Sequence, residues 1–232
     1  MQELRMLGAG AAKGLVTALR PVFRAEAGVD VHADFGAVGA MKDRLLAGEP
    51  CDLIILTAAL VDDLRVHLHV VAESVAAIGR VGTGIAVRAG DALPTLADGA
   101  ALRRALLAAT AIFVPDPQRA TAGIHFVDVL RRLGVRADVE PRLRAYPNGA
   151  TAMRVLAAEG GPGMIGCTQV SEILYTPGVT LAGTLPGQFA LSTVYSVAVC
   201  TRARAPELAG RFAQWLAGPR SAALRAQGGF EA

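Results

Sequence analysis

Apolar positions along the chain alternate between short runs typical of strands and longer stretches with helical spacing. Residues 53–56 are continuously apolar, as in a strand that a parallel sheet buries on both faces. Leu15 and Leu19 recur at a spacing that places them on one face of a helix. Each of three expected strands precedes a helical stretch: residues 3–7, 29–35 and 53–56. Three β–α units in succession predict a parallel sheet with helices on both faces.

A further strand is expected at residues 82–87, and a second series of elements begins after a break in the pattern at residues 88–94. The expected elements after this break are helix 101–107, strand 111–114, helices 124–133 and 150–158, strand 164–167, helix 170–174, strand 193–200, and helices 206–216 and 219–227. We therefore predict two α/β lobes, residues 1–87 with 192–232 and residues 88–191. Each is expected to be a mainly parallel sheet flanked by helices, with its ligand crevice at the carboxyl ends of the strands.

Two loops of small residues follow the first two strands. Residues 8–12 read Gly-Ala-Gly-Ala-Ala, and residues 36–40 read Gly-Ala-Val-Gly-Ala. Small side chains leave backbone N–H groups at helix N-termini uncovered, where the helix dipole favours an anion. The expected donors are Gly10, Ala11, Val38 and Gly39. The first loop also approaches the dinucleotide fingerprint GxGxxG, but its third glycine comes one residue late.

The composition is that of a globular protein, with 232 residues of which 53% are hydrophobic and 19% charged. The net charge is +3, lysines and arginines are scattered, and aromatics make up 5%, so we expect no nucleic-acid partner. No stretch reaches the ~18 apolar residues of a membrane span. No leader pattern precedes the first strand, so a cytoplasmic location and a removed signal peptide both stay open.

Sequence motifs of metal sites and of several enzyme classes are absent. The cysteines Cys51, Cys167 and Cys200 lie far apart beside apolar runs, where small buried side chains are expected. No CxxC or clustered Cys and His spacing is present, so we expect no metal and no other cofactor. GxSxG, HExxH and Walker motifs are also missing, which argues against hydrolases, zinc proteases and nucleoside triphosphatases.

The order of these landmarks resembles the molybdate-binding, type II periplasmic solute-binding proteins. The matching landmarks are the two small-residue loops, the stretch LLAGEPCDLIILTA at residues 45–58, and the segments 117–123 and 164–172. This resemblance spans nearly the whole chain and implies a two-lobed type II periplasmic-binding-protein fold with a cleft between the lobes. It also implies a small anionic ligand, an ABC transporter permease as partner and a periplasmic location, and we expect a monomer.

The residues carried over from the resemblance lack two hydroxyl groups. The serine of the family's first loop falls at Ala11, and that of its second loop at Ala37 or Val38. The cleft alanine of the family matches Ala122, its backbone donor matches Asn148 or Gly149, and its tyrosine falls at Gln169. A charge-assisted hydrogen bond contributes ~1.5–3 kcal/mol, so the loss of both hydroxyls favours a small carboxylate over molybdate.

Charged residues near the expected anion site are few. Lys13 lies in the first turn of the first helix. Arg119 precedes the helix start formed by Thr121, Ala122 and Gly123, and its planar guanidinium suits a carboxylate. A solvated surface position is the alternative for both side chains.

Polar side chains at strand ends complete the predicted site. Thr57 ends the third strand, and Gln169 is similarly placed after the strand at residues 164–167. His125, in the first turn of its helix, is a candidate donor or proton carrier, with a surface or capping position as the alternative.

Three functions agree with this pattern. The first is a solute-binding protein that captures a small anion. The second is an isomerase of a small tricarboxylate such as aconitate on the same scaffold, with His125 or Lys13 as base. The third is a regulatory ligand-binding module, against which the absence of a helix-turn-helix segment argues.

Overall fold

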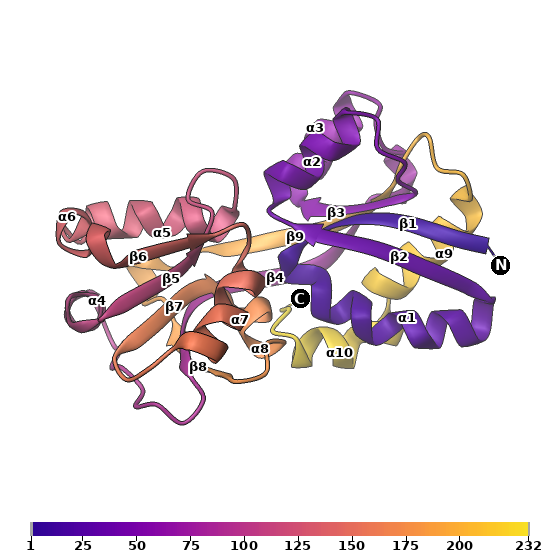
Figure 1. Cartoon of the computed structure of the whole chain (residues 1–232). Helices are drawn as coiled ribbons and strands as arrows, with labels where there is room; N and C mark the ends of the chain where they lie inside the picture. The colour runs from indigo at the N-terminus through magenta and orange to yellow at the C-terminus, as the bar shows by residue number, and fades with distance from the viewer. Residues whose placement is uncertain (1, 232) are drawn as a thin grey trace. The chain divides into compact units, whose positions relative to one another are not determined.

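The computed structural model describes residues 2–231, and its contacts divide the chain into two compact units. Unit 1 contains the described residues up to Val81 and those from Thr193 onward, and unit 2 is Gly82–Ser192. The chain enters unit 2 within β4 (Ala76–Arg88) and returns to unit 1 at the start of β9 (Ser192–Val199). In both units, helices flank strands that form parallel and antiparallel pairs (Figure 1).

Four strands of unit 1 are hydrogen-bonded in the order β2, β1, β3, β9. β1 (Gln2–Ala9) pairs in parallel with β2 (Val29–Gly36) and with β3 (Leu53–Thr57). β9 runs antiparallel to β3, with Leu53 in register with Val199. The three parallel strands, each followed by a helix, confirm the β–α units that the apolar pattern predicts.

The helices of unit 1 cover its sheet. They are η1 (Gly10–Ala12), α1 (Lys13–Ala27), α2 (Val38–Leu46), α3 (Ala58–Val66), η2 (Ala72–Ser74), α9 (Pro206–Ala217), η5 (Pro219–Ser221) and α10 (Ala222–Gln227). Phe23 of α1 packs against Phe212 and Trp215 of α9, with ring centroids 4.7 and 5.0 Å apart. These aromatic contacts join the N-terminal and C-terminal parts of the chain in one core.

In unit 2, β5 lies between two parallel neighbours. β5 (Ala111–Pro115) is parallel to β6 (Leu143–Tyr146) and to β7 (Met164–Gln169). β4 runs antiparallel to β7 and to β8 (Val179–Thr184). The helices are α4 (Gly99–Ala108), α5 (Thr121–Arg132), α6 (Arg136–Val139), η3 (Glu140–Arg142), α7 (Gly149–Glu159), α8 (Val170–Leu174) and η4 (Gly187–Phe189).

The unit 2 sheet buries both of its faces. Along β5, Ile112 and Val114 belong to a cluster with Leu102 of α4 and Phe126 of α5. Phe113, between them, belongs to a second cluster formed with α7 and α8. Because successive strand residues point to opposite faces, this alternation shows that helices cover the sheet on both sides.

Several elements differ from those predicted, and three of the differences are the most informative. β8 was not expected, β4 begins six residues before the predicted strand at 82–87, and α5 begins three residues before the predicted helix at 124–133. No residue of β8 is fully buried, and its sequence VTLAGT lacks the continuous apolar run of a strand that is buried on both faces. The earlier start of α5 places Thr121, Ala122 and Gly123 in its first turn.

Candidate anion-binding site

The carboxyl ends of β1, β2 and β3 meet at one edge of the unit 1 sheet, which we call the unit 1 edge. Ala9 at the end of β1 is in register with Gly36 at the end of β2. Gly8 is in register with Ile55, two residues before the end of β3. Since these strands lead into α1, α2 and α3, three helix N-termini with their unpaired N–H groups gather at this edge.

No side chain caps these three helices. Ala12 precedes α1 and Ala37 precedes α2, and alanine has no side-chain acceptor. Thr57 precedes α3, but its hydroxyl makes no capping hydrogen bond. The first-turn N–H groups at the unit 1 edge therefore suit a bound anion.

Six of the predicted site residues lie at the unit 1 edge. They are Gly10 and Ala11 in η1, Lys13 at the start of α1, Val38 and Gly39 at the start of α2, and Thr57 at the end of β3. Ala11 and Val38 are buried, whereas Lys13 is exposed.

Unit 2 repeats this arrangement at the carboxyl ends of β5, β6 and β7, which we call the unit 2 edge. Pro115 at the end of β5 is in register with Tyr146 at the end of β6, and β7 is parallel to β5. The remaining predicted residues lie here: Arg119, Thr121, Ala122, Gly123 and His125 in or before α5, Asn148 and Gly149 at the start of α7, and Gln169 at the end of β7.

The loop before α5 is held by Asp116. Its Oδ1 accepts hydrogen bonds from the N–H groups of Gln118 and Arg119, at 2.7 and 3.0 Å. The first turn of α5 then packs directly on this loop, because a Cβ at Gly123 would lie 2.2 Å from the carbonyl oxygen of Asp116. Glycine is thus required at position 123 by backbone packing. Arg119 is exposed.

The N-terminus of α7 is capped from within unit 2. Asn148 Oδ1 accepts a hydrogen bond from the N–H of Thr151 at 2.8 Å. Glu172 Oε1 accepts one from the N–H of Ala150 at 3.2 Å, and the N–H of Gly149 also bonds this carboxylate. An internal carboxylate therefore occupies the position where an anionic ligand would meet this helix.

Glu172 is a buried carboxyl group whose pKa lies above its usual value. Burial raises the pKa, while hydrogen bonds from the Thr168 hydroxyl and from backbone N–H groups partly oppose the shift. The carboxyl fits because position 149 is glycine. A Cβ there would lie 1.9 Å from Thr168 Oγ1 and 2.0 Å from Glu172 Oε2.

Buried polar groups without a protein partner lie on the paired strands β4 and β7 of unit 2. Both side-chain polar atoms of Gln169 and the Thr83 hydroxyl are buried, and none bonds another described residue. Gln169 and Thr83 are opposite each other in the β4–β7 register. Since buried polar groups in folded proteins are almost always hydrogen-bonded, this pair is a candidate contact for a polar ligand.

His125 contacts the protein itself. Its Nε2 lies 2.8 Å from the carbonyl oxygen of Phe189 in η4, a contact that requires a proton on Nε2. This contact ties α5 to η4. Of the two bases predicted for an isomerase, His125 is thus engaged within unit 2, and Lys13 is exposed in unit 1.

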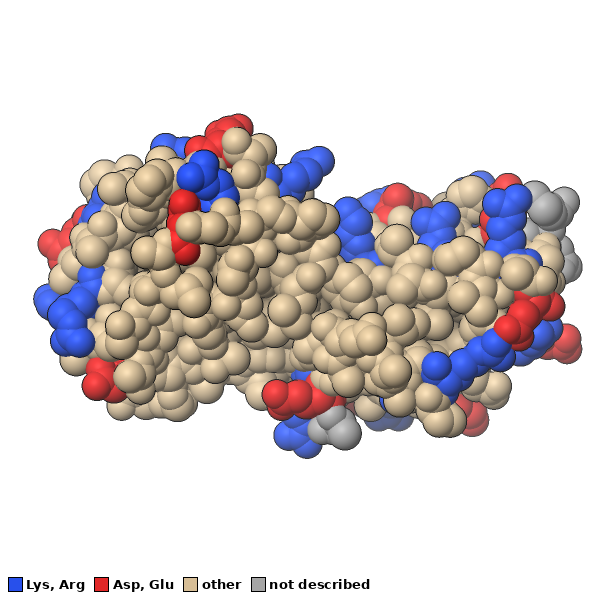
Figure 2. Space-filling view, turned by 90° about the horizontal axis from the view of Figure 1, so that it is seen from below, with Lys and Arg blue, Asp and Glu red and all other residues tan. Residues whose placement is uncertain are grey.

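Charged groups are interspersed on the surface. On the face seen in Figure 2, basic and acidic side chains alternate among larger areas of other residues. Within residues 2–231, no three His, Cys, Asp or Glu side chains are arranged to hold a metal ion. No helix in the same range is long and apolar enough to cross a membrane.

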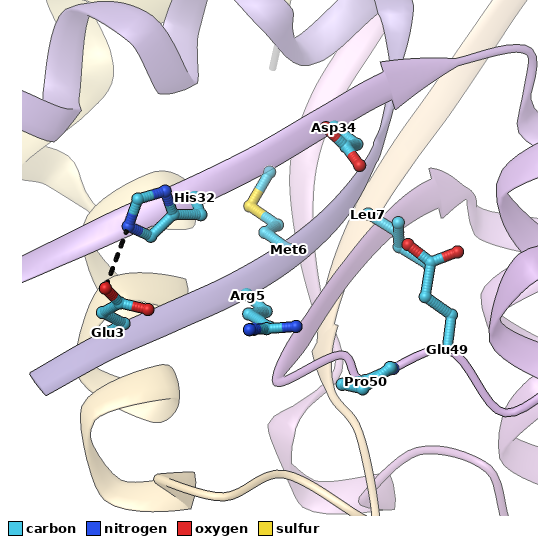
Figure 3. Close-up of a pocket in the computed structure, with 8 residues that line it drawn as sticks. All are labelled: Glu3, Arg5, Met6, Leu7, His32, Asp34, Glu49 and Pro50. Carbon is cyan, nitrogen blue, oxygen red and sulfur yellow. Dashed lines mark ion pairs between the residues drawn. The ribbon is translucent and has the colours of Figure 1, made fainter.

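A separate pocket of about 260 Å³ lies on unit 1 (Figure 3). It is lined by Glu3, Arg5, Met6, Leu7, His32, Asp34, Glu49 and Pro50. His32 Nε2 lies 3.6 Å from Glu3 Oε1, and Arg44 pairs with both Asp34 and Glu49. Three carboxylates line this pocket, so it does not suit an anion, and it contains none of the predicted site residues.

Sequence reasoning missed Glu172, Thr83 and Asp116. The polar run Thr168-Gln169 followed by Ser171-Glu172 interrupts an apolar stretch and is the signal that indicates Glu172. Thr83 stands alone between glycines in a buried strand. Asp116 precedes the start of α5 by five residues, a position typical of a loop-ordering aspartate.

Comparisons with known proteins agree with this architecture. Residues 4–231 match the sequence profile of the bacterial extracellular solute-binding proteins. The chain is 26% identical over 225 residues to an aconitate isomerase from Pseudomonas sp., covering 92% of this chain and 82% of the isomerase. It is 25% identical over 225 residues to the molybdate-binding protein ModA of Escherichia coli (strain K12), covering 95% and 86%.

A solved structure gives the same fold. The Azotobacter vinelandii periplasmic molybdate-binding protein superimposes with a TM-score of 0.82 and 18% identity, covering 99% of both chains. The fold is that of the type II periplasmic binding proteins. The chain belongs to the family of bacterial extracellular solute-binding proteins, and within it resembles the molybdate-binding type, as the sequence landmarks predict.

Proposed function

We propose that this chain is the solute-binding component of an ABC transporter and binds a small anion through backbone N–H groups at the unit 1 edge. The observation that carries the proposal is the set of three helix N-termini without side-chain caps. Donors of this kind need no side-chain reorganisation to receive a negative charge. Membership of the solute-binding family supports the transport role.

The anion that fits this chain best is a small carboxylate. Ala11 and Ala37 or Val38 stand where the family resemblance places serine hydroxyls, so two neutral donors for a tetrahedral oxyanion are replaced by apolar groups. Lys13, at the start of α1, supplies a positive charge for a carboxylate at the same edge. The relatives named for aconitate and for molybdate are nearly equally distant, at 26% and 25%, so identity alone favours neither ligand.

Titration calorimetry on the full chain with citrate, trans-aconitate and molybdate tests the ligand class. We expect a carboxylate to bind at least about tenfold more tightly than molybdate, equivalent to ~1.4 kcal/mol. Lys13→Ala should weaken carboxylate binding about threefold, or ~0.7 kcal/mol, because it removes an exposed cation at the unit 1 edge. Arg103→Ala, at an exposed position of α4, is the matched control and should bind like the wild type. Tighter binding of molybdate, unaffected by Lys13→Ala, would refute the carboxylate assignment.

A second candidate function is isomerisation of a small tricarboxylate. Two observations favour it: the relative named aconitate isomerase, and the buried Glu172, whose raised pKa suits a proton carrier. Proton NMR of trans-aconitate incubated with the protein tests this function. Formation of the cis isomer that is lost in Glu172→Gln would establish turnover, whereas bound but unchanged trans-aconitate would leave solute binding as the function.

A further inference from the structure

Two cysteines that are far apart in sequence lie on neighbouring backbone segments of unit 1. Cys51 precedes β3 by two residues, and Cys200 follows the last residue of β9. The antiparallel pairing of β3 with β9 continues past the strand ends, because the N–H of Cys200 donates to the carbonyl oxygen of Asp52 at 2.9 Å. Cys200 is therefore opposite the residue that follows Cys51.

The two thiols share one environment. Their residues are 6% and 2% exposed, and both line a single cavity of about 150 Å³ between the end of α2 and the segment after β9. Interaction with the Cys51 thiol, together with burial, raises the pKa of the Cys200 thiol. Cys167, the third cysteine, is buried in unit 2 with no cysteine neighbour in that unit.

The backbone around this thiol pair is fixed by Asp52. Its carboxylate accepts hydrogen bonds from the N–H of Arg5 at 2.8 Å and from the N–H of Arg204 at 2.6 Å. The segment that follows Cys200 is thus tied to the residue that follows Cys51. A disulfide requires Cα atoms roughly 4.4–6.8 Å apart. Cys51 and Cys200 are diagonal neighbours across the two segments, and their thiols are within hydrogen-bonding contact of each other.

We propose that Cys51 and Cys200 form a reversible disulfide bond, a redox site that is separate from the anion site. The two S–H bonds break and one S–S bond forms, releasing two protons and two electrons. A disulfide-containing oxidant accepts them and is reduced to two thiols. The shared cavity gives the oxidant a route to the thiols. The closed loop contains the whole of unit 2, so the bond constrains a large part of the unfolded chain.

Mass spectrometry of the full chain after treatment with oxidised glutathione tests the proposal. We expect an intact mass lower by about 2 Da, the loss of two hydrogen atoms, and a proteolytic peptide pair joined through Cys51 and Cys200. Reduction with dithiothreitol should restore the original mass. The oxidised wild type should also unfold at a higher temperature than the reduced one.

Variants separate this bond from other thiol chemistry. Cys167→Ser is the matched control and should lose the same two hydrogens, whereas Cys51→Ser and Cys200→Ser should not. The wild-type peptide map decides the question even if a variant fails to fold. A full set of free thiols after oxidation, a bond to Cys167, or glutathione adducts alone would overturn the proposal.

Discussion

Both units place helix N-termini at the carboxyl ends of parallel strands, but α7 of unit 2 is capped, whereas α1, α2 and α3 of unit 1 and α5 of unit 2 have no side-chain cap. At the unit 1 edge, the residues before α1 and α2 are alanines, and the threonine before α3 makes no cap. At the unit 2 edge, Asn148 and the Glu172 carboxylate satisfy the first turn of α7. The backbone N–H groups at the unit 1 edge thus stay available for a negatively charged ligand. In unit 2, the Glu172 carboxylate occupies the N–H groups of α7, and the unpartnered Gln169 side chain is a neutral contact for a ligand.

This difference teaches that the same topology does not make equivalent sites. A β-strand running into a helix always brings N–H groups to the sheet edge, but the residue before the helix decides whether they stay available. Substitutions that disturb the cap of α7 in unit 2, or that add a cap to a helix of unit 1, therefore test the comparison most sharply.

The largest effect is expected from closing the space that Glu172 uses. In Gly149→Ala, the new Cβ would collide with Thr168 Oγ1 and Glu172 Oε2, so the buried carboxylate must move away from its donors. We expect the free energy of unfolding, from urea titration followed by circular dichroism, to fall by about 3 kcal/mol.

The control for this substitution is Gly210→Ala in α9. Nothing lies within 4 Å of a Cβ at Gly210, so alanine there should be neutral or stabilising by under about 1 kcal/mol. Equal effects of the two substitutions would show that Glu172 is not held in the way described.

A carboxylate placed at the unit 1 edge should occupy the N–H groups of a helix there, as Glu172 occupies those of α7 in unit 2. Ala37 has φ −61° and ψ 139°, the backbone conformation of a capping residue, so Ala37→Asp should cap α2 with a charged group. We expect anion affinity in calorimetry to fall by at least about tenfold, because the aspartate competes for the same N–H groups and repels the ligand.

Ala37→Asn provides the matched comparison, since asparagine caps about as well without a charge. Its affinity should lie between those of the wild type and Ala37→Asp. Wild-type affinity in both variants would mean that the N-terminus of α2 does not contact the anion.

The smallest effect concerns the pH dependence of stability. Because the pKa of Glu172 is raised in the folded state, its contribution to stability is complete below the unfolded-state pKa and is lost as the pH rises through the folded-state value. Glu172→Gln removes this titration. Thermal unfolding between about pH 4 and pH 8 should show the wild type losing stability relative to the variant as the pH rises. Parallel curves for the two proteins would contradict the raised pKa.

The sequence predicts the fold well where the signal is local. The continuous apolar run at residues 53–56 and the loops beginning at Gly8 and Gly36 indicate β1, β2, β3 and the helices that follow. β8 could not be predicted, because none of its residues is fully buried and its apolar–polar alternation ends after Leu181.

The candidate site is less accessible to sequence reasoning, because its decisive contacts are not local. Gly149 reads as a free backbone donor until the fold places Glu172 against it and against Ala150, which precedes Glu172 by 22 residues. Likewise, Thr83 faces Gln169 only through the pairing of β4 with β7. Small-residue loops can be recognised in a sequence, whereas the tertiary structure determines whether another side chain bonds their N–H groups.

We propose that the unit 1 helix N-termini, and not that of α7, bind the anion. Amide chemical shifts in an isotope-labelled sample titrated with citrate test it most directly. We predict the largest shifts for the N–H groups of Val38, Gly39 and Ala58 and near-constant positions for Gly149 and Ala150, which already bond Glu172. Large shifts at Gly149 and Ala150 with unchanged amides at the unit 1 edge would contradict the account.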